Sequence, residues 1–212
     1  MPKPFAALPG KQTAALFALI KPLYPEIQQA SSVLETGLSN LNAIFHPEGM
    51  IMNAGWIQHT NGSFLFYREG FTDAVGRVTA AVDAERMAIA KALGIAVSPF
   101  IDVFYEAGLT SLAARESRDI ARACKESEPN KTIKSPCSLD HRYVHEDVGY
   151  GLVPMAALGA LADVPAPTIG ALVQLAGLAV GIDYVRKGLT LERLGLAGKS
   201  PTELLHFVQE GV

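Results

Sequence analysis

The chain lacks several features that would assign it quickly to a class of protein. Its 212 residues contain only two cysteines and one tryptophan. Cys124 and Cys137 cannot build a disulfide framework, and no second ligand pair stands beside them, so we expect no metal site and a reducing, cytoplasmic compartment. The formal net charge is −3 without a basic stripe. The sequence therefore argues against a nucleic-acid partner.

A long apolar run is present at one place only, and it is a poor membrane span. Residues 164–182 carry no charge, which meets the length of a spanning helix. The run contains Pro165, Pro167 and Gln174, is rich in alanine and glycine, and has no aromatic belt. A helix that is apolar all round is favoured to be buried, so we expect a central helix and no membrane partner.

Most of the chain has the 3.6-residue periodicity of helices. Residues 55–67 differ, because side chains alternate along residues 56–60 and Asn61-Gly62 then precedes the run at residues 63–67, which is a strong hairpin signal. The expected fold is therefore all-α (mainly), a bundle of about eight helices with one short β-hairpin. The helices are predicted at residues 39–54, 72–93, 98–108, 111–125, 145–161, 168–181, 190–194 and 201–209.

The first thirty residues follow another pattern. Residues 13–28 have helical spacing, but Pro22 and Pro25 interrupt it, and residues 30–34 predict a short extended stretch. This pattern is typical of the tail of a domain. We expect residues 1–30 to be the remnant of the end of a preceding domain, and residues 31–212 to form the helical domain.

The first candidate for chemistry is His46. It precedes Pro47 inside a predicted helix, and a proline there frees a carbonyl one turn back. Polar residues in the same apolar segment need partners when buried. These residues are Asn42, Glu48 and Asn53. A lone histidine on an apolar face is more often a core residue than a catalyst, so both interpretations stay open.

The densest polar cluster of the chain lies at residues 135–154. Arg142 can clamp a carboxylate through two parallel hydrogen bonds. Asp147 can accept a hydrogen bond from a histidine ring and fix its tautomer. The sequence leaves open whether the histidine is His46, His141 or His145. A solvated loop whose acidic residues favour a helix N-terminus is the plainer alternative.

Taken together, these segments resemble the C-terminal α-helical domain of the octopine/nopaline (opine) dehydrogenase family, which is related in fold to 6-phosphogluconate-type dehydrogenases. The similarity extends from about residue 30 to residue 210. It is carried by the order and spacing of short matching segments. These are residues 34–42, His46-Pro47, residues 64–67, residues 83–86, Leu93-Gly94, residues 141–143, Glu146-Asp147 and residues 151–154.

The resemblance implies roles for individual residues. His46 would act as the acid/base, Asp147 would orient it, and Arg142 would contact a substrate carboxylate. Asn42, Asn53 and Trp56 are expected to contribute to substrate binding, although Trp56 could instead pack on the hairpin face. The substrates would be an amino acid and a 2-oxo acid, whose imine is reduced to a secondary amine.

The resemblance also implies a cofactor that this chain is not expected to hold alone. NAD or NADP would be bound by an N-terminal nucleotide-binding domain or subunit, and no Gly-x-Gly-x-x-Gly fingerprint follows a strand here. Its cofactor-binding residues are therefore unknown. We expect the substrate-binding and catalytic half of an oxidoreductase that is inactive by itself, with a second copy of the chain, as in a dimer, among its candidate partners. The alternative is a non-catalytic helical module for dimerisation or ligand binding.

Overall fold

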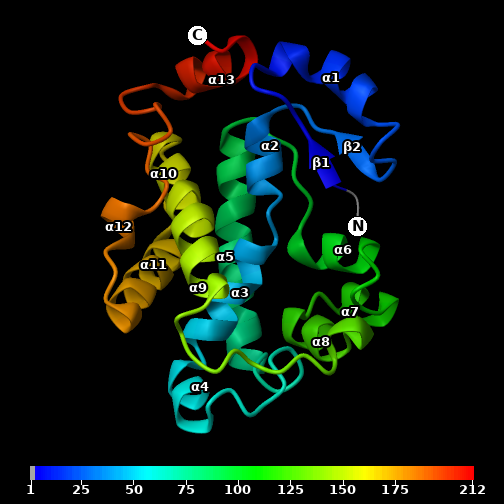
Figure 1. Ribbon diagram of the computed structural model, residues 1–212, viewed down its shortest axis with the longest axis vertical. Coiled ribbons are helices and arrows are strands. Elements are labelled where there is room, and N and C mark those ends of the chain that lie inside the picture. Colours follow the sequence, from blue (N-terminus) through cyan, green and yellow to red (C-terminus); the bar gives the residue numbers. More distant parts are fainter. Residues whose placement is uncertain (1–2) are drawn as a thin grey trace.

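The computed structural model describes residues 3–212, and its helices pack around one long central helix, α5 (Asp73–Ala92) (Figure 1). The Thr72 hydroxyl accepts a hydrogen bond from the amide of Val75 and caps its first turn. Gly94, with φ +68°, follows its last turn. Helices α3, α8, α10 and α11 all contact α5. The predicted helix at residues 72–93 is confirmed.

The other helices confirm the mainly all-α fold. They are α1 (Thr13–Ile20), α2 (Val33–Leu38), α3 (Asn42–Ile51), α4 (Ala54–Thr60), α6 (Phe100–Glu106), α7 (Leu112–Ser117), α8 (Ile120–Lys125), α9 (Arg142–Asp147), α10 (Val153–Leu161), α11 (Pro167–Val180), α12 (Tyr184–Lys187) and α13 (Pro201–Glu210). Two 3₁₀ turns cover Gly10–Gln12 and Glu128–Asn130, and a π-helical turn covers Val148–Leu152.

Two predicted helices are divided and one is misplaced. Between α7 and α8, Arg118 adopts a left-handed conformation and the Asp119 side chain caps α8, which breaks the predicted helix at 111–125. The π-helical turn separates α9 from α10 within the helix predicted at 145–161. Residues 190–194 form a turn, whereas a short helix lies just before them, at α12.

The predicted hairpin at residues 55–67 is wrong, because α4 occupies the position of its first strand. Asn61 ends that helix in the left-handed conformation, with φ 52°. Asparagine and glycine tolerate positive φ in hairpin turns and at helix C-termini alike, so Asn61-Gly62 marks both equally well. The only pairing near the predicted second strand, within residues 3–212, is an isolated antiparallel bridge between Leu65 and Lys134.

A small β-α-β unit lies at one side of the helical body, beside α6 (Figure 1). Strand β1 (Lys3–Phe5) pairs in parallel with β2 (Ile27–Gln29), and α1 connects them. The extended segment therefore lies just before the predicted one at residues 30–34. There Ser32 instead caps α2, since its side chain accepts a hydrogen bond from the amide of Glu35.

The uncharged run at residues 164–182 becomes α11, a helix with one buried face. Ile169 and Ala176 are buried, but Leu175 and Leu178 are 51% and 76% exposed. Complete central burial, as the sequence suggested, is therefore wrong for this helix. Among residues 3–212 there is no helix with both the length and the apolar character needed to cross a membrane.

Arg86 of α5 is fully buried and joins three segments of the fold. Its guanidinium donates to Asp83 Oδ1, to the carbonyl oxygen of Leu38 at the end of α2, and to that of Ser98 before α6. Asp83 Oδ2 accepts a hydrogen bond from the amide of Phe100. Because a buried charge must be paired, this network fixes the separation of α2, α5 and α6, which border the site described next.

Candidate acid/base site

The centre of the candidate site is a buried hydrogen bond between two residues 101 positions apart. Nδ1 of His46, on α3, lies 2.8 Å from Oδ2 of Asp147, at the end of α9. Their relative exposures are only 6% and 8%. Because a carboxylate only accepts hydrogen bonds, Nδ1 carries the hydrogen, and Nε2 is left as the nitrogen that can exchange a proton.

Aromatic side chains hold the His46 ring in place. Nε2 lies 3.2 Å from the hydroxyl oxygen of Tyr67. The ring of Tyr143 stacks on the imidazole with centroids 3.5 Å apart and planes 13° apart, and the ring of Phe45 lies 4.3 Å away. We call His46, Asp147 and Tyr67 the inner trio. Packed on two sides and hydrogen-bonded at both nitrogens, the imidazole has a fixed orientation.

Close helix packing brings α3 and α9 together. Directly after Asp147 the chain makes the π-helical turn, a feature that is frequent at functional sites. A Cβ atom on Gly151 of this turn would lie 2.4 Å from the Cβ of Ala43 on α3. Only glycine allows this approach, and the close contact lets the Asp147 carboxylate reach the His46 ring.

Burial controls the protonation of this site. It lowers the pKa of His46 below its ordinary value of 6.5, and the hydrogen bond with Asp147 opposes that change. Glu48, one half-turn further along α3, is fully buried, and neither of its carboxyl oxygens has a hydrogen-bond partner among the described residues. Burial raises the pKa of Glu48 to about 8. His46 therefore stays neutral near neutral pH, and Glu48 carries a proton there.

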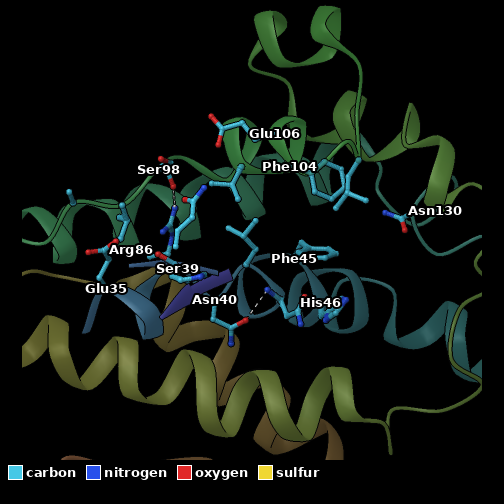
Figure 2. Close-up of a pocket in the computed structure, with 18 of the residues that line it drawn as sticks. Glu35, Ser39, Asn40, Phe45, His46, Arg86, Ser98, Phe104, Glu106 and Asn130 are labelled. Atoms are coloured by element: carbon cyan, nitrogen blue, oxygen red, sulfur yellow. Dashed lines mark hydrogen bonds between the residues drawn. The ribbon is translucent and has the colours of Figure 1, made fainter. Parts of the chain in front are cut away.

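His46 and Tyr67 lie on the wall of a cavity of about 400 Å³. Its walls come from the ends of α2 and α3, from the chain between residues 96 and 109, and from β1 and β2. Figure 2 shows His46 and Phe45 towards one end of the cavity and Glu35 and Arg86 towards the other. Acid/base chemistry on a small molecule held in this space is what the arrangement allows.

The other residues that the sequence singled out lie in different places. Asn42 is exposed and lines the cavity. Arg142 is also exposed, in the first turn of α9, where it forms an ion pair of 3.0 Å with Glu146, and its charge contributes to lowering the pKa of His46. The structure thus places Asn42 at the cavity with His46, whereas Arg142 is not among the described residues that line it.

Asn53 and Trp56 are not among the described residues that line the cavity. The buried side-chain amide of Asn53 donates to the carbonyl oxygens of Gly49 and Gly70, at 2.8 and 3.0 Å. Trp56 stacks on Phe64 with centroids 3.9 Å apart. Packing of α4 against the following loop accounts for both side chains.

A second histidine has the same types of partner on the outside of α9. His145 lies 2.8 Å from Asp140 through Nε2 and 2.7 Å from the Tyr184 hydroxyl through Nδ1. We call these three residues the outer trio. His141 caps α9, accepting a hydrogen bond from the amide of Tyr143. Of the three histidines that the sequence left open, His46 is therefore the one that pairs with Asp147.

Sequence reasoning missed Tyr67 and Tyr143 as parts of the site. Both stand in segments that carried the family resemblance, residues 64–67 and 141–143, and each brings a phenol ring to His46. The available signal was the position of a tyrosine inside each matching segment, to which sequence reasoning assigned no role.

The chain is thus a helical domain with a buried histidine–carboxylate pair at a cavity. The family described as "NAD/NADP octopine/nopaline dehydrogenase, alpha-helical domain" matches residues 29–180. The chain therefore belongs to this family, and the expected resemblance is confirmed.

Individual relatives agree with that assignment. The chain is 36% identical over 194 residues to an opine dehydrogenase of Arthrobacter sp. (strain 1C), covering 92% of this chain and 52% of that protein. It is 29% identical over 168 residues to Protein ocs of Agrobacterium tumefaciens (strain Ach5), covering 79% of this chain and 45% of the relative. The chain thus spans about half the length of the curated relatives that it matches.

Solved structures share the fold. Octopine dehydrogenase with NADH and L-arginine superimposes with a TM-score of 0.69 at 18% identity, over 91% of this chain and 54% of that one. Octopine dehydrogenase in complex with NADH and agmatine gives a TM-score of 0.68 at 17% identity, over 89% of this chain and 53% of that one. At such identities the likeness shows the helical fold.

Proposed function

We propose that this chain is the substrate-binding and catalytic helical part of an opine dehydrogenase-like oxidoreductase. The reaction is the reductive condensation of an amino acid with a 2-oxo acid. The observation that carries the proposal is the buried hydrogen bond between His46 and Asp147 at the wall of a cavity. Membership of the family supports the reaction class.

In this proposal each polar residue has a distinct task. His46 accepts a proton from the amino group through Nε2 and later returns one to the departing hydroxyl. Asp147 keeps the imidazole in the tautomer whose Nε2 is free, and it stabilises the imidazolium that forms. Arg142, whose ion pair with Glu146 is exposed and exchangeable, binds a substrate carboxylate, and Asn42 adds a hydrogen bond at the cavity wall.

The nicotinamide cofactor would supply the hydride. Among residues 3–212 no glycine-rich loop leads from a strand into a helix in the manner of a dinucleotide fingerprint. These residues do not fit a nucleotide site of their own. We therefore assign NAD or NADP to a nucleotide-binding domain or subunit beside this chain, and we derive no hydride step from the residues present.

We infer that residues 1–30 are the closing segment of such a nucleotide-binding domain, with residues 1 and 2 lying outside the described part. The parallel pairing of β1 and β2 across α1 supports this inference, since parallel strands joined by a helix are the repeating unit of nucleotide-binding folds. Pro4, Gln28 and Gln29 also line the cavity. The nucleotide domain would then lie beside the substrates.

Consumption of NAD(P)H tests the proposal. The polypeptide that contains this chain, together with its nucleotide-binding part, is supplied with NAD(P)H, a panel of amino acids, and pyruvate or another 2-oxo acid. Oxidation is expected only when both substrates are present, and His46→Gln should lower it by roughly 10²-fold or more. His145→Gln is the matched control and should retain activity. Absence of oxidation with every pair would contradict the proposed function.

A helical dimerisation module is the second candidate, and exposed apolar residues on α11 and α12 favour it. Leu178 and Val185 are 76% and 68% exposed. Light scattering over a range of concentrations measures self-association, and Leu178→Asp should abolish it if this surface is the interface. A dimer that persists in this variant would place the contact elsewhere.

A further inference from the structure

Nε2 of His46 has a tyrosine hydroxyl as its hydrogen-bond partner. Nδ1 is committed to Asp147, so every proton that His46 gains or loses in the reaction passes through Nε2. The atom that faces Nε2 is the hydroxyl oxygen of Tyr67, at 3.2 Å. Tyr143 covers one face of the imidazole and Phe45 packs beside it, and the Tyr67 hydroxyl is the group that bonds Nε2 beside the cavity.

Tyr67 cannot swing out of this position easily. The residue is only 4% exposed. The ring of Phe71 lies parallel to it at 6.0 Å, the ring of Phe66 meets it edge-on at 5.2 Å, and Phe45 lies 5.7 Å away. Tyr67 nevertheless lines the same cavity as His46. Tyr67 is therefore a tightly packed side chain that bonds Nε2 through its hydroxyl and borders the space available to the substrate.

The protonation state of the Tyr67 hydroxyl restricts its role in proton transfer. Burial raises the pKa of Tyr67 above its ordinary value of 10, and the neighbouring Tyr143 adds to that rise. A phenol that stays protonated is not a base by itself. A hydroxyl that both donates and accepts can, however, release its hydrogen to one partner while it takes another from the opposite side.

We propose that Tyr67 is a catalytic residue that passes protons between Nε2 of His46 and the substrate in the cavity. This inference rests on the proposed function. When the carbinolamine loses water, the C–O bond breaks and the nitrogen lone pair forms the C=N bond. The departing oxygen takes the hydrogen of Tyr67, and the Tyr67 oxygen takes the hydrogen of Nε2 from protonated His46. The products are the iminium, one water molecule and neutral His46.

The first test is the number of protons that move. In wild-type enzyme, the plot of turnover rate against the mole fraction of deuterium oxide should be bowed, because two hydrogens move in one step. Tyr67→Phe should lower turnover by roughly 10²-fold and give a straight line. Tyr184→Phe removes the other tyrosine hydroxyl that bonds a histidine, and it should keep the wild-type rate and the bowed plot.

The second test requires no turnover and uses this chain alone. The ¹⁵N resonance of Nε2 of His46 should move to higher frequency in Tyr67→Phe, since an acceptor nitrogen loses its donor. The Nδ1 proton shared with Asp147 should persist, which shows that the site remains folded. Tyr184→Phe should leave both signals unchanged.

The outcomes separate the two proposals. A wild-type enzyme without any turnover contradicts the proposed function and the proton relay together, whatever the resonance spectra show. Three results would overturn the role of Tyr67 and leave the oxidoreductase assignment intact. They are normal turnover in Tyr67→Phe, a straight isotope plot in the wild type, and an Nε2 resonance that does not move in Tyr67→Phe.

Discussion

The inner and outer trios contain the same three types of residue, and their surroundings differ. In the inner trio Nδ1 of His46 meets Asp147 and Nε2 meets Tyr67. In the outer trio the two nitrogens are exchanged, because Nε2 of His145 meets Asp140 and Nδ1 meets Tyr184. The side chain of Asp140 is 93% exposed, whereas that of Asp147 is 10% exposed. The same residue types therefore form one buried and one exposed cluster, and burial distinguishes the two histidines.

The two trios share one short helix, and its geometry separates them. His145 and Asp147 stand two positions apart on α9, which places them on roughly opposite faces. Asp147 points inward to α3, and His145 points outward to solvent and Tyr184. Charges that face water are screened, so the outer ion pair contributes little to the stability of the fold. The inner pair interacts in a medium of lower permittivity, where electrostatic interactions are stronger.

Replacing the carboxylate of each trio in turn should give the largest difference in turnover between the two trios. Asp147→Asn should lower turnover by roughly 10³- to 10⁴-fold, because an amide can hold the imidazole in the wrong tautomer and cannot stabilise its charged form. Asp140→Asn should leave turnover unchanged. Steady-state kinetics of the two variants, with unfolding curves to show that both fold, check this prediction. Equal losses in both would mean that burial does not distinguish the trios.

The carboxyl group of Glu48 should make the stability of the inner region depend on pH. Its pKa rises from 4.5 in the unfolded chain to about 8 in the folded one. The folded state thus binds the proton more tightly, and this stabilisation is complete below pH 4.5 and is lost as pH rises through about 8. Over that interval the free energy of unfolding should fall by about 3 kcal/mol or more.

Glu48→Gln keeps the size of the side chain and removes its titration. Urea unfolding at pH 5 and pH 8 should show a much smaller difference in this variant than in the wild type. Burial depresses the pKa of His46, so its contribution has the opposite sign and is lost as pH falls below 6.5. His46 is present in both proteins, which leaves Glu48 as the cause of any difference. Identical pH dependence in both proteins would contradict the prediction.

The π-helical turn offers a third comparison, because two of its glycines face different trios. A Cβ atom on Gly151 would meet Ala43 at 2.4 Å, beside the inner trio. One on Gly149 would meet Tyr184 of the outer trio at an ordinary 3.4 Å. Gly151→Ala should cost about 1–3 kcal/mol through overpacking and should weaken the Nδ1 proton signal of His46. Gly149→Ala should do neither.

Relief of the crowding gives the control for this third prediction. Ala43→Gly combined with Gly151→Ala removes one methyl group and adds another at the same contact, so the Nδ1 proton signal should return. If Gly151→Ala leaves that signal unchanged, the approach of the π-helical turn to α3 does not set the distance between His46 and Asp147.

Local sequence signals predicted the parts of the fold that depend on local chemistry. Thr72 and Gly94 mark the ends of α5 correctly, because a side-chain cap and a positive φ are properties of single residues. Asn61-Gly62 failed for the same reason, since it satisfies two different backbone geometries. The π-helical turn has no sequence signature that the periodicity of apolar residues reveals, and the split of α9 from α10 was therefore missed.

The candidate site was predictable only through the family resemblance. Nothing in the periodicity of residues 39–54 or 142–147 shows that His46 and Asp147 meet across 101 positions, because tertiary packing decides it. The resemblance supplied the pairing of His46 with Asp147 and did not supply Tyr67. The phenol reaches Nε2 through the aromatic packing of Phe66 and Phe71, which depends on the complete fold.

The outer trio itself should yield the smallest effects, and these define the baseline of the comparison. Asp140→Asn should change the free energy of unfolding by less than about 0.5 kcal/mol, since the carboxylate is surrounded by water. Tyr184→Phe should cost about 1 kcal/mol, because its ring is buried and its hydroxyl bonds His145. Chemical unfolding of the two single variants and of the double variant measures these two changes in the free energy of unfolding and the coupling between them. A coupling of several kcal/mol between Asp140 and Tyr184 would mean that the outer trio is a cooperative unit like the inner one, and the difference in burial would then no longer separate them.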